Sequence, residues 1–115
     1  MASARQARGA YGERRAANWY LAHGYEVLDR NWRHGRSGEL DLVVARPGEL
    51  VFCEVKARAS AEYGVAEAVT PTKQARIRRL AMAWLEAHPS QRRHTLRFDV
   101  ACVTGTDLEV IESAF

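Results

Sequence analysis

Apolar residues recur along the chain at two spacings, one typical of α-helices and one typical of β-strands. Helical spacing over residues 10–23 predicts a helix that Gly24 ends. A second helix is predicted from Thr70 to about Ala87, because Thr70 suits the N-cap and Pro71 the first helical position. Its predicted apolar face consists of Ile77, Leu80, Ala81, Trp84 and Leu85.

Short runs rich in apolar residues, most of them alternating with polar ones, predict strands at residues 25–31, 39–45, 50–55, 96–103 and 108–111. Pro47 and Gly48 suit a type II turn, so the second and third strands are predicted to form a hairpin. Residues 32–37 are predicted to be a polar turn region, and residues 57–69 a loop with a short helical piece. The resulting order is helix, three strands, helix, two strands, which predicts an α/β protein.

Three acidic residues lie at positions where the pattern favours apolar side chains. Glu13 lies on the apolar side of the first helix, Glu54 shares a strand face with Phe52, and Asp41 precedes an apolar run. The strand at 39–45 is predicted to carry Glu39, Asp41 and Val43 on one face and Leu40, Leu42 and Val44 on the other. A charge in such surroundings is costly unless another group pairs with it.

If Glu13, Asp41 and Glu54 converge, they need a cation. Two unit charges about 5 Å apart repel by roughly 3 kcal/mol at an effective dielectric constant near 20. Lys56 is one candidate partner, and a plain ion pair between Glu54 and Lys56 would be purely structural. A divalent metal is the other candidate, and carboxylate oxygens suit Mg²⁺ or Mn²⁺.

These residues resemble a known nuclease motif. Asp41, twelve intervening residues and then Glu54-Val55-Lys56 resemble the PD-(D/E)XK signature. The surrounding strings resemble the bacterial YraN-type family: GERRAANWYLAHGYEVLDRNWR at 12–33, GELDLVVA at 38–45, VFCEVKAR at 51–58 and RFDV at 97–100. That family is similar to archaeal Holliday junction resolvases.

The resemblance implies a restriction-endonuclease-like fold, in which helices flank a central mixed sheet. It implies that Asp41, Glu54 and the carbonyl of Val55 bind Mg²⁺. Lys56 would then hold or activate the attacking water. A carboxylate-bound metal can activate water, neutralise phosphate oxygens and stabilise the leaving alkoxide, which is what phosphodiester hydrolysis requires.

The resemblance also covers two further acids. Glu13 corresponds to the acid on the first helix of the resolvases, which implies a further metal ligand, direct or through water. Glu39 belongs to the family string and is predicted to be peripheral. The position before Asp41 holds Leu40 instead of the proline of the signature.

Length and composition restrict the possible classes of protein. The 115 residues, 47% hydrophobic, predict one domain over 1–115, with residues 1–8 as a flexible basic tail. The chain shows no membrane-span pattern and no secretory signal. Cys53 and Cys102 lie inside apolar runs and suggest no disulfide framework, so we expect a cytoplasmic protein.

Charge adds DNA as an expected partner. Residues 70–97 carry seven bases against one acid, and of the 17 basic residues all except Lys56 and Lys73 are arginine. The planar guanidinium group of arginine can donate two parallel hydrogen bonds to a phosphate. The residues predicted to contact DNA are Arg30, Arg33, Arg58, Lys73, Arg76 and Arg79.

Two functions remain open on the sequence alone. The first is a Mg²⁺-dependent endonuclease that hydrolyses DNA, with branched or otherwise structured DNA as the implied substrate. The alternative is a non-catalytic nucleic-acid-binding module that keeps the nuclease fold. By analogy with the resolvases, the chain is expected to form a homodimer.

Overall fold

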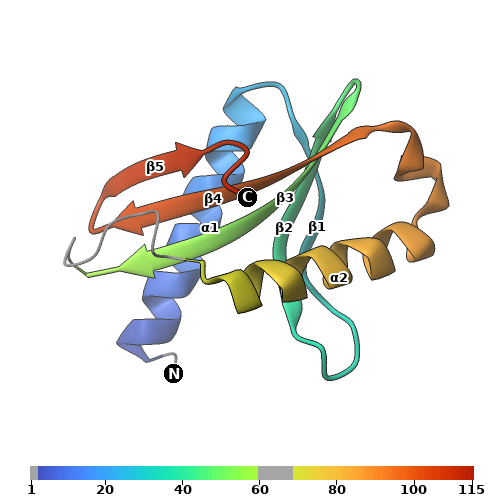
Figure 1. Cartoon of the computed structure of the whole chain (residues 1–115). Helices are drawn as coiled ribbons and strands as arrows, with labels where there is room; N and C mark the ends of the chain where they lie inside the picture. The colour runs from blue at the N-terminus through green and yellow to red at the C-terminus, as the bar shows by residue number, and fades with distance from the viewer. Residues whose placement is uncertain (1–2, 60–68) are drawn as a thin grey trace.

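The computed structural model describes residues 3–59 and 69–115, which form a five-stranded sheet with a long helix on each face (Figure 1). The elements are α1 (Ala4–Ala22), β1 (Glu26–Arg33), β2 (Glu39–Arg46), β3 (Glu49–Arg58), α2 (Pro71–Ala87), a 3₁₀ helix η2 (Pro89–Arg93), β4 (Thr95–Thr104) and β5 (Asp107–Ile111). The predicted class and the predicted order of helices and strands are therefore confirmed.

The strands lie in the sheet in chain order, β1-β2-β3-β4-β5. Neighbouring strands are antiparallel except for β3 and β4, which run parallel. A parallel pair needs a crossover connection, and α2 lies in the segment that joins β3 to β4. Within the described part of the chain, no helix is long and apolar enough to cross a membrane.

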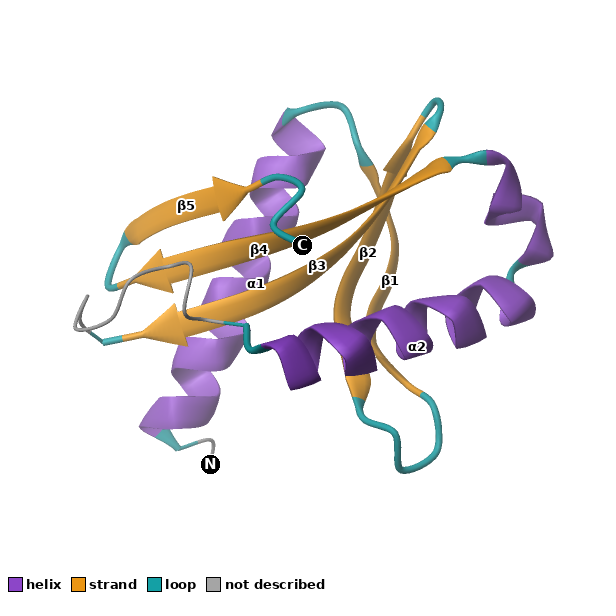
Figure 2. Ribbon diagram, in the orientation of Figure 1, coloured by secondary structure: helices purple, strands orange, loops and turns teal. Residues whose placement is uncertain are grey.

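Each helix buries its apolar side against a different face of the sheet (Figure 2). On one face α2 packs against β3 residues such as Phe52, and all five residues of its predicted apolar stripe are buried. On the other face α1 buries Ala16, Ala17 and Tyr20 against the opposite side of β3. The predicted N-cap of α2 is confirmed, because the Thr70 hydroxyl accepts a hydrogen bond from the amide of Lys73.

The first helix is longer than predicted. It begins at Ala4, so residues 4–8, predicted to belong to a flexible tail, are helical. The cause is a capping box: Gln6 donates its amide to the Ser3 hydroxyl, and its side chain accepts from the Ser3 amide. Similarly, β3 continues to Arg58, beyond the predicted loop boundary at 57, whereas residues 60–68 lie outside the described part.

The prediction of strict alternation along β2 is wrong. Leu40 packs in the core beneath α2, whereas Leu42 packs in the core beneath α1. Side chains alternate only while the strand's own backbone stays regularly extended, so β2 departs from regular pleating between these two leucines. The departure lies where the register with β3 begins, at Leu42 opposite Cys53.

Candidate functional site

Three carboxylates converge where β2 approaches α1. Glu13 of α1 and Glu39 and Asp41 of β2 each place a carboxylate oxygen within 4.8 Å of the others, and all three are partly exposed. The Asn31 side-chain amide donates to Glu13 at 3.0 Å and to Glu39 at 3.2 Å. Of the three acids predicted to converge, the structure brings together Glu13 and Asp41, whereas Glu54 is not part of this group. The structure also places Glu39 inside the group, so its predicted peripheral position is wrong.

Two backbone features bring these acids together. Asn31 adopts φ 48°, a left-handed conformation that asparagine tolerates better than most residues, and so lies between Glu13 and Glu39. Gly12 allows α1 to approach β3 closely, because a Cβ atom there would lie 2.9 Å from the Cβ of Ala57. This close packing sets the position of the next residue, Glu13, relative to the sheet.

Asp41 accepts a main-chain hydrogen bond and has a raised pKa. Its Oδ2 atom accepts a hydrogen bond from the main-chain N–H of Val55 at 2.9 Å. Burial and the nearby Glu54 charge raise the pKa of Asp41 to about 7, and Glu13 and Glu39 add to this, while the Val55 amide opposes it. The metal-binding role predicted for the Val55 carbonyl stays a prediction.

The donor set fits a small divalent cation. Mg²⁺ binds oxygen ligands at about 2.0–2.1 Å, so two oxygens on opposite sides of one ion are about 4 Å apart. Three ligands of one ion also include neighbouring oxygens only about 3 Å apart, and the oxygens of Glu13, Glu39 and Asp41 lie within 4.8 Å of one another, so shifts of up to about 2 Å would bring them to ligand spacing. Hard carboxylate oxygens are also the donors that Mg²⁺ and Mn²⁺ prefer.

The raised pKa of Asp41 predicts how the stability of the metal-free protein depends on pH. Between its usual pKa of 3.8 and about 7, the folded state binds a proton that the unfolded state has released. Stability therefore falls as pH rises through this window. Urea unfolding in EDTA at pH 5 and pH 8 should show a larger loss for the wild type than for Asp41→Asn. Equal losses in the two proteins would contradict the raised pKa.

Glu54 lies on the α2 side and is paired with lysines. Only 8% of Glu54 is exposed. Its Oε1 atom lies 3.8 Å from Nζ of Lys56 and 3.3 Å from Nζ of Lys73. The ion pair with Lys56 considered from the sequence therefore exists, and Lys73 of α2 joins it. Burial lowers the pKa of Lys56, and the neighbouring Lys73 lowers it further.

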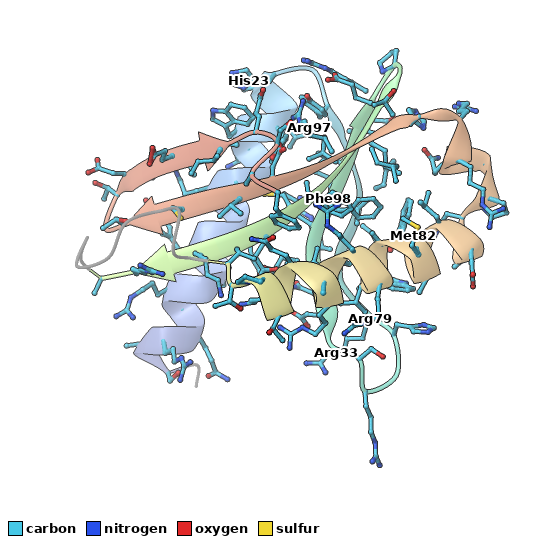
Figure 3. All side chains as sticks on the ribbon, in the orientation of Figure 1. His23, Arg33, Arg79, Met82, Arg97 and Phe98 are labelled. Atoms are coloured by element: carbon cyan, nitrogen blue, oxygen red, sulfur yellow. The ribbon has the colours of Figure 1, made fainter. Side chains whose placement is uncertain are left out.

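The predicted DNA-contacting residues do not form a single group. Lys73, Arg76 and Arg79 line one pocket of about 320 Å³ along the first turns of α2, together with Thr70 and Thr72. Figure 3 shows Arg79 on α2 and Arg33 on β1 in the same lower part of the view. Arg33 is exposed and its Nε atom lies 3.3 Å from Oε2 of Glu39, which places it beside the acids.

The other two predicted residues lie elsewhere. Arg30 is exposed on β1, the strand at one edge of the sheet. Arg58 is the last residue of β3, and its carbonyl accepts a hydrogen bond from the amide of Gly105. Contact of either residue with DNA stays a prediction.

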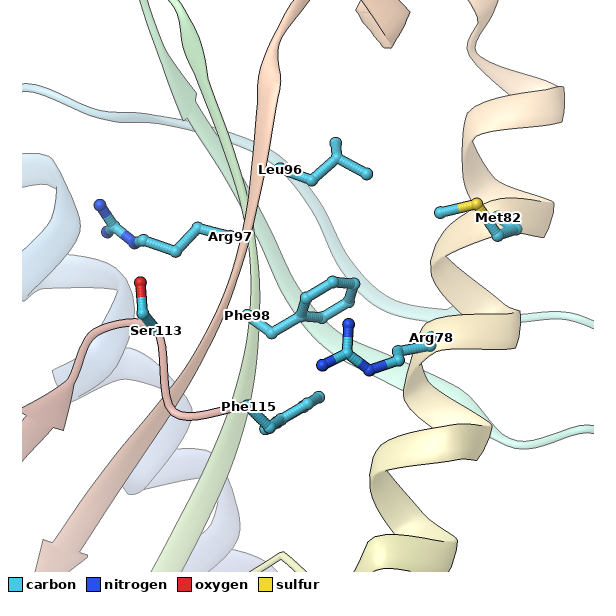
Figure 4. Close-up of a pocket in the computed structure, with 7 residues that line it drawn as sticks. All are labelled: Arg78, Met82, Leu96, Arg97, Phe98, Ser113 and Phe115. Carbon is cyan, nitrogen blue, oxygen red and sulfur yellow. The ribbon is translucent and has the colours of Figure 1, made fainter.

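A larger cavity of about 510 Å³ lies on the other side of α2 (Figure 4). It is lined by Arg78, Met82, Leu96, Arg97, Phe98, Ser113 and Phe115. The Arg78 guanidinium lies 4.8 Å from the ring centre of Phe98 and 5.3 Å from that of Phe115. None of the three clustered acids is among these lining residues, so the cavity is distinct from the candidate site.

Comparison with known proteins assigns the chain to a family. The model of Uncharacterised protein family UPF0102 matches residues 12–103, so the chain belongs to that family, which confirms the YraN-type assignment. A UPF0102 protein of Frankia casuarinae is 54% identical over 102 residues, covering 88% of this chain and 85% of that protein. One of Kineococcus radiotolerans is 55% identical, covering 88% and 83%. One of Acidothermus cellulolyticus is 43% identical, covering 99% and 97%.

Proposed function

We propose that the protein is a Mg²⁺- or Mn²⁺-dependent endonuclease of the PD-(D/E)XK class that hydrolyses phosphodiester bonds of DNA. The observation that supports this proposal is the convergence of Glu13, Glu39 and Asp41, because a divalent cation would offset the repulsion among three carboxylates within 4.8 Å. The lysine of the nuclease motif, Lys56, lies 3.8 Å from Glu54, the second acid of that motif.

Each residue has a role in this proposal. Asp41, Glu13 and Glu39 would hold the cation, which when bound supplies an activated water and neutralises phosphate oxygens. Lys56, with its lowered pKa, would hold the attacking water and offset negative charge on the phosphate. Glu54 keeps Lys56 and Lys73 in place through the two ion pairs.

Incubating the purified protein with Mg²⁺, Mn²⁺ or EDTA on linear, nicked, flapped and four-way DNA tests the function. We expect cleavage only with a divalent metal, and faster cleavage of a branched form than of linear duplex. Absence of both metal binding and cleavage on every DNA form would contradict the proposal.

A single observation favours a second candidate, a nucleic-acid-binding module without catalysis. The charge of Glu54 is already balanced by Lys56 and Lys73, so this acid needs no metal to be stable. Calorimetric titration with Mg²⁺ and Mn²⁺ separates the two candidates. Salt-dependent DNA binding without metal binding would favour the module.

Glu13 is expected to belong to the metal site. Glu13→Gln should leave the fold intact, because the glutamine carbonyl can still accept the hydrogen bond from Asn31. It should weaken Mn²⁺ binding several-fold, because one anionic ligand is lost. Calorimetric titration measures the affinity, and thermal unfolding checks the fold.

The matched control is Glu86→Gln, the same change at an exposed residue of α2, which should leave Mn²⁺ affinity unchanged. A third variant, Glu13→Leu, gives the opposing outcome. If it stabilises the protein and metal affinity stays at the wild-type value, Glu13 lies outside the metal site.

A further inference from the structure

A polar pocket with three cationic side chains lies beside Glu54, the second acid of the nuclease motif. It has a volume of about 320 Å³ and is lined by Thr70, Thr72, Lys73, Arg76 and Arg79. Lys73 connects it to the second acid of the nuclease motif, because its Nζ atom lies 3.3 Å from Oε1 of Glu54. The pocket therefore reaches Glu54 through the ion pair between α2 and β3, while Glu13, Glu39 and Asp41 lie outside its lining.

A second segment brings further positive charge to the same place. A Cβ atom on Gly38, which follows the β1–β2 turn, would lie 3.5 Å from Cδ of Arg76. Gly38 has φ +109°, a conformation that side chains disfavour, and this lets the chain turn beside α2. Arg33, the last residue before this turn, and Arg36, within it, are both exposed. The β1–β2 turn therefore packs against Arg76 of the pocket and adds two exposed cations to this side of the chain.

The chemistry of the lining identifies the ligand class. Arg76 and Arg79 are exposed and offer planar donor forks that match phosphate oxygens, and the threonine hydroxyls can donate as well. The pocket also lies at the first turns of α2, where the helix dipole favours an anion. Clustered cations repel one another in the empty pocket, so an anionic ligand stabilises the arrangement.

We propose that this pocket binds the DNA phosphate next to the one that is hydrolysed. The inference rests on the proposed function and deepens it. A strand entering the acid site passes Lys73 and places its neighbouring phosphate between Arg76 and Arg79. The substrate is then a strand with at least two consecutive phosphates, because an isolated phosphodiester cannot fill the pocket and the acid site together.

The first experiment measures DNA binding without metal. In EDTA, the logarithm of the affinity for a short duplex is measured against the logarithm of the salt concentration. Arg76→Gln and Arg79→Gln should each lower affinity and flatten the slope by about 0.9, the value for one phosphate contact. The matched control is Arg78→Gln, because Arg78 lies on the same helix but stacks on Phe98. Unchanged slopes in the pocket variants, or an equal change in the control, would overturn the proposal.

The second experiment tests the position of the phosphate. In Mg²⁺, a neutral methylphosphonate is placed at the phosphate on either side of the cleaved bond. At one side it should slow the wild type at least tenfold and slow Arg76→Gln much less. Equal slowing of both proteins at both sides would overturn the proposal.

The two experiments keep the inference separate from the proposed function. If the wild type cleaves DNA but Arg76→Gln and Arg79→Gln keep the wild-type salt slope, the pocket proposal is overturned and the proposed function stands. Flattened slopes without cleavage of any DNA form would contradict the nuclease and leave the pocket as a phosphate-binding site.

Discussion

Asp41→Asn is expected to abolish DNA cleavage and to weaken Mg²⁺ and Mn²⁺ binding by more than tenfold, which corresponds to more than about 1.4 kcal/mol. Asp41 lies between Glu13, Glu39 and Glu54, whose charges all raise its pKa. Asparagine keeps the shape but removes the anionic ligand on which water activation depends. Calorimetric titration measures the metal affinity, and a cleavage assay in Mg²⁺ measures the activity.

DNA binding separates this role from a structural one. In EDTA, Asp41→Asn should bind DNA as tightly as the wild type or more tightly, because a negative charge near the phosphate is removed. The control is Asp107→Asn, the same change at an exposed residue of β5, which should leave metal binding and cleavage intact. Asp41→Asn cutting DNA at the wild-type rate would contradict its role as a metal ligand.

The sequence predicted the fold well where local signals and tertiary packing agree. In α2 the apolar stripe, the Thr70 cap and Pro71 at the first position all indicate the same helix, and the structure confirms it. The start of α1 was missed because residues 4–8 have no apolar stripe. Its signal was the capping pair Ser3 and Gln6, which lies before the predicted start.

The candidate site was predictable only in part. Glu13, Asp41 and Glu54 stood out because each is an acid in apolar surroundings. Glu39 was predicted to be peripheral, although alternation already placed it on the same strand face as Asp41, and the structure places it in the group of acids. That shared face, together with membership of the GELD string, was its local signal. Alternation along β2 could not show that Asn31 of β1 donates to both Glu13 and Glu39.

The pairing of Lys73 with Glu54 had no signal in the sequence. Lys73 lies on the polar side of α2, where a lysine usually faces solvent, and was predicted to contact DNA. Only the packing of α2 across the sheet brings it within 3.3 Å of the acid. Contacts between residues far apart in the sequence depend on tertiary structure. The local pattern therefore shows that Lys73 is on the polar side of the helix but cannot show which acid it pairs with.

A different buried acid holds the C-terminal segment on the sheet. Asp99 is 0% exposed and accepts hydrogen bonds from the Tyr20 hydroxyl at 2.6 Å, from Arg97 at 2.9 Å and from the Ser113 amide at 3.0 Å. Arg97, two residues before Asp99 in β4, also forms an ion pair with it. Asp99 therefore joins α1, β4 and the segment after β5.

Asp99→Ala is expected to lower the free energy of unfolding by about 3–5 kcal/mol, because it leaves the largely buried Arg97 without its main partner. Small domains are stable by only about 5–15 kcal/mol, so this loss is a large part of the total, and Tyr20→Phe gives a graded second measurement. Removing that hydroxyl should cost about 1–3 kcal/mol, because Asp99 loses one of its donors.

Urea unfolding measures the stability of both variants. Tyr11→Phe in the same helix is the control and should lose less stability, since Tyr11 is only partly buried. Wild-type stability in both Asp99→Ala and Tyr20→Phe would show that the network does not hold α1 and the C-terminal segment together.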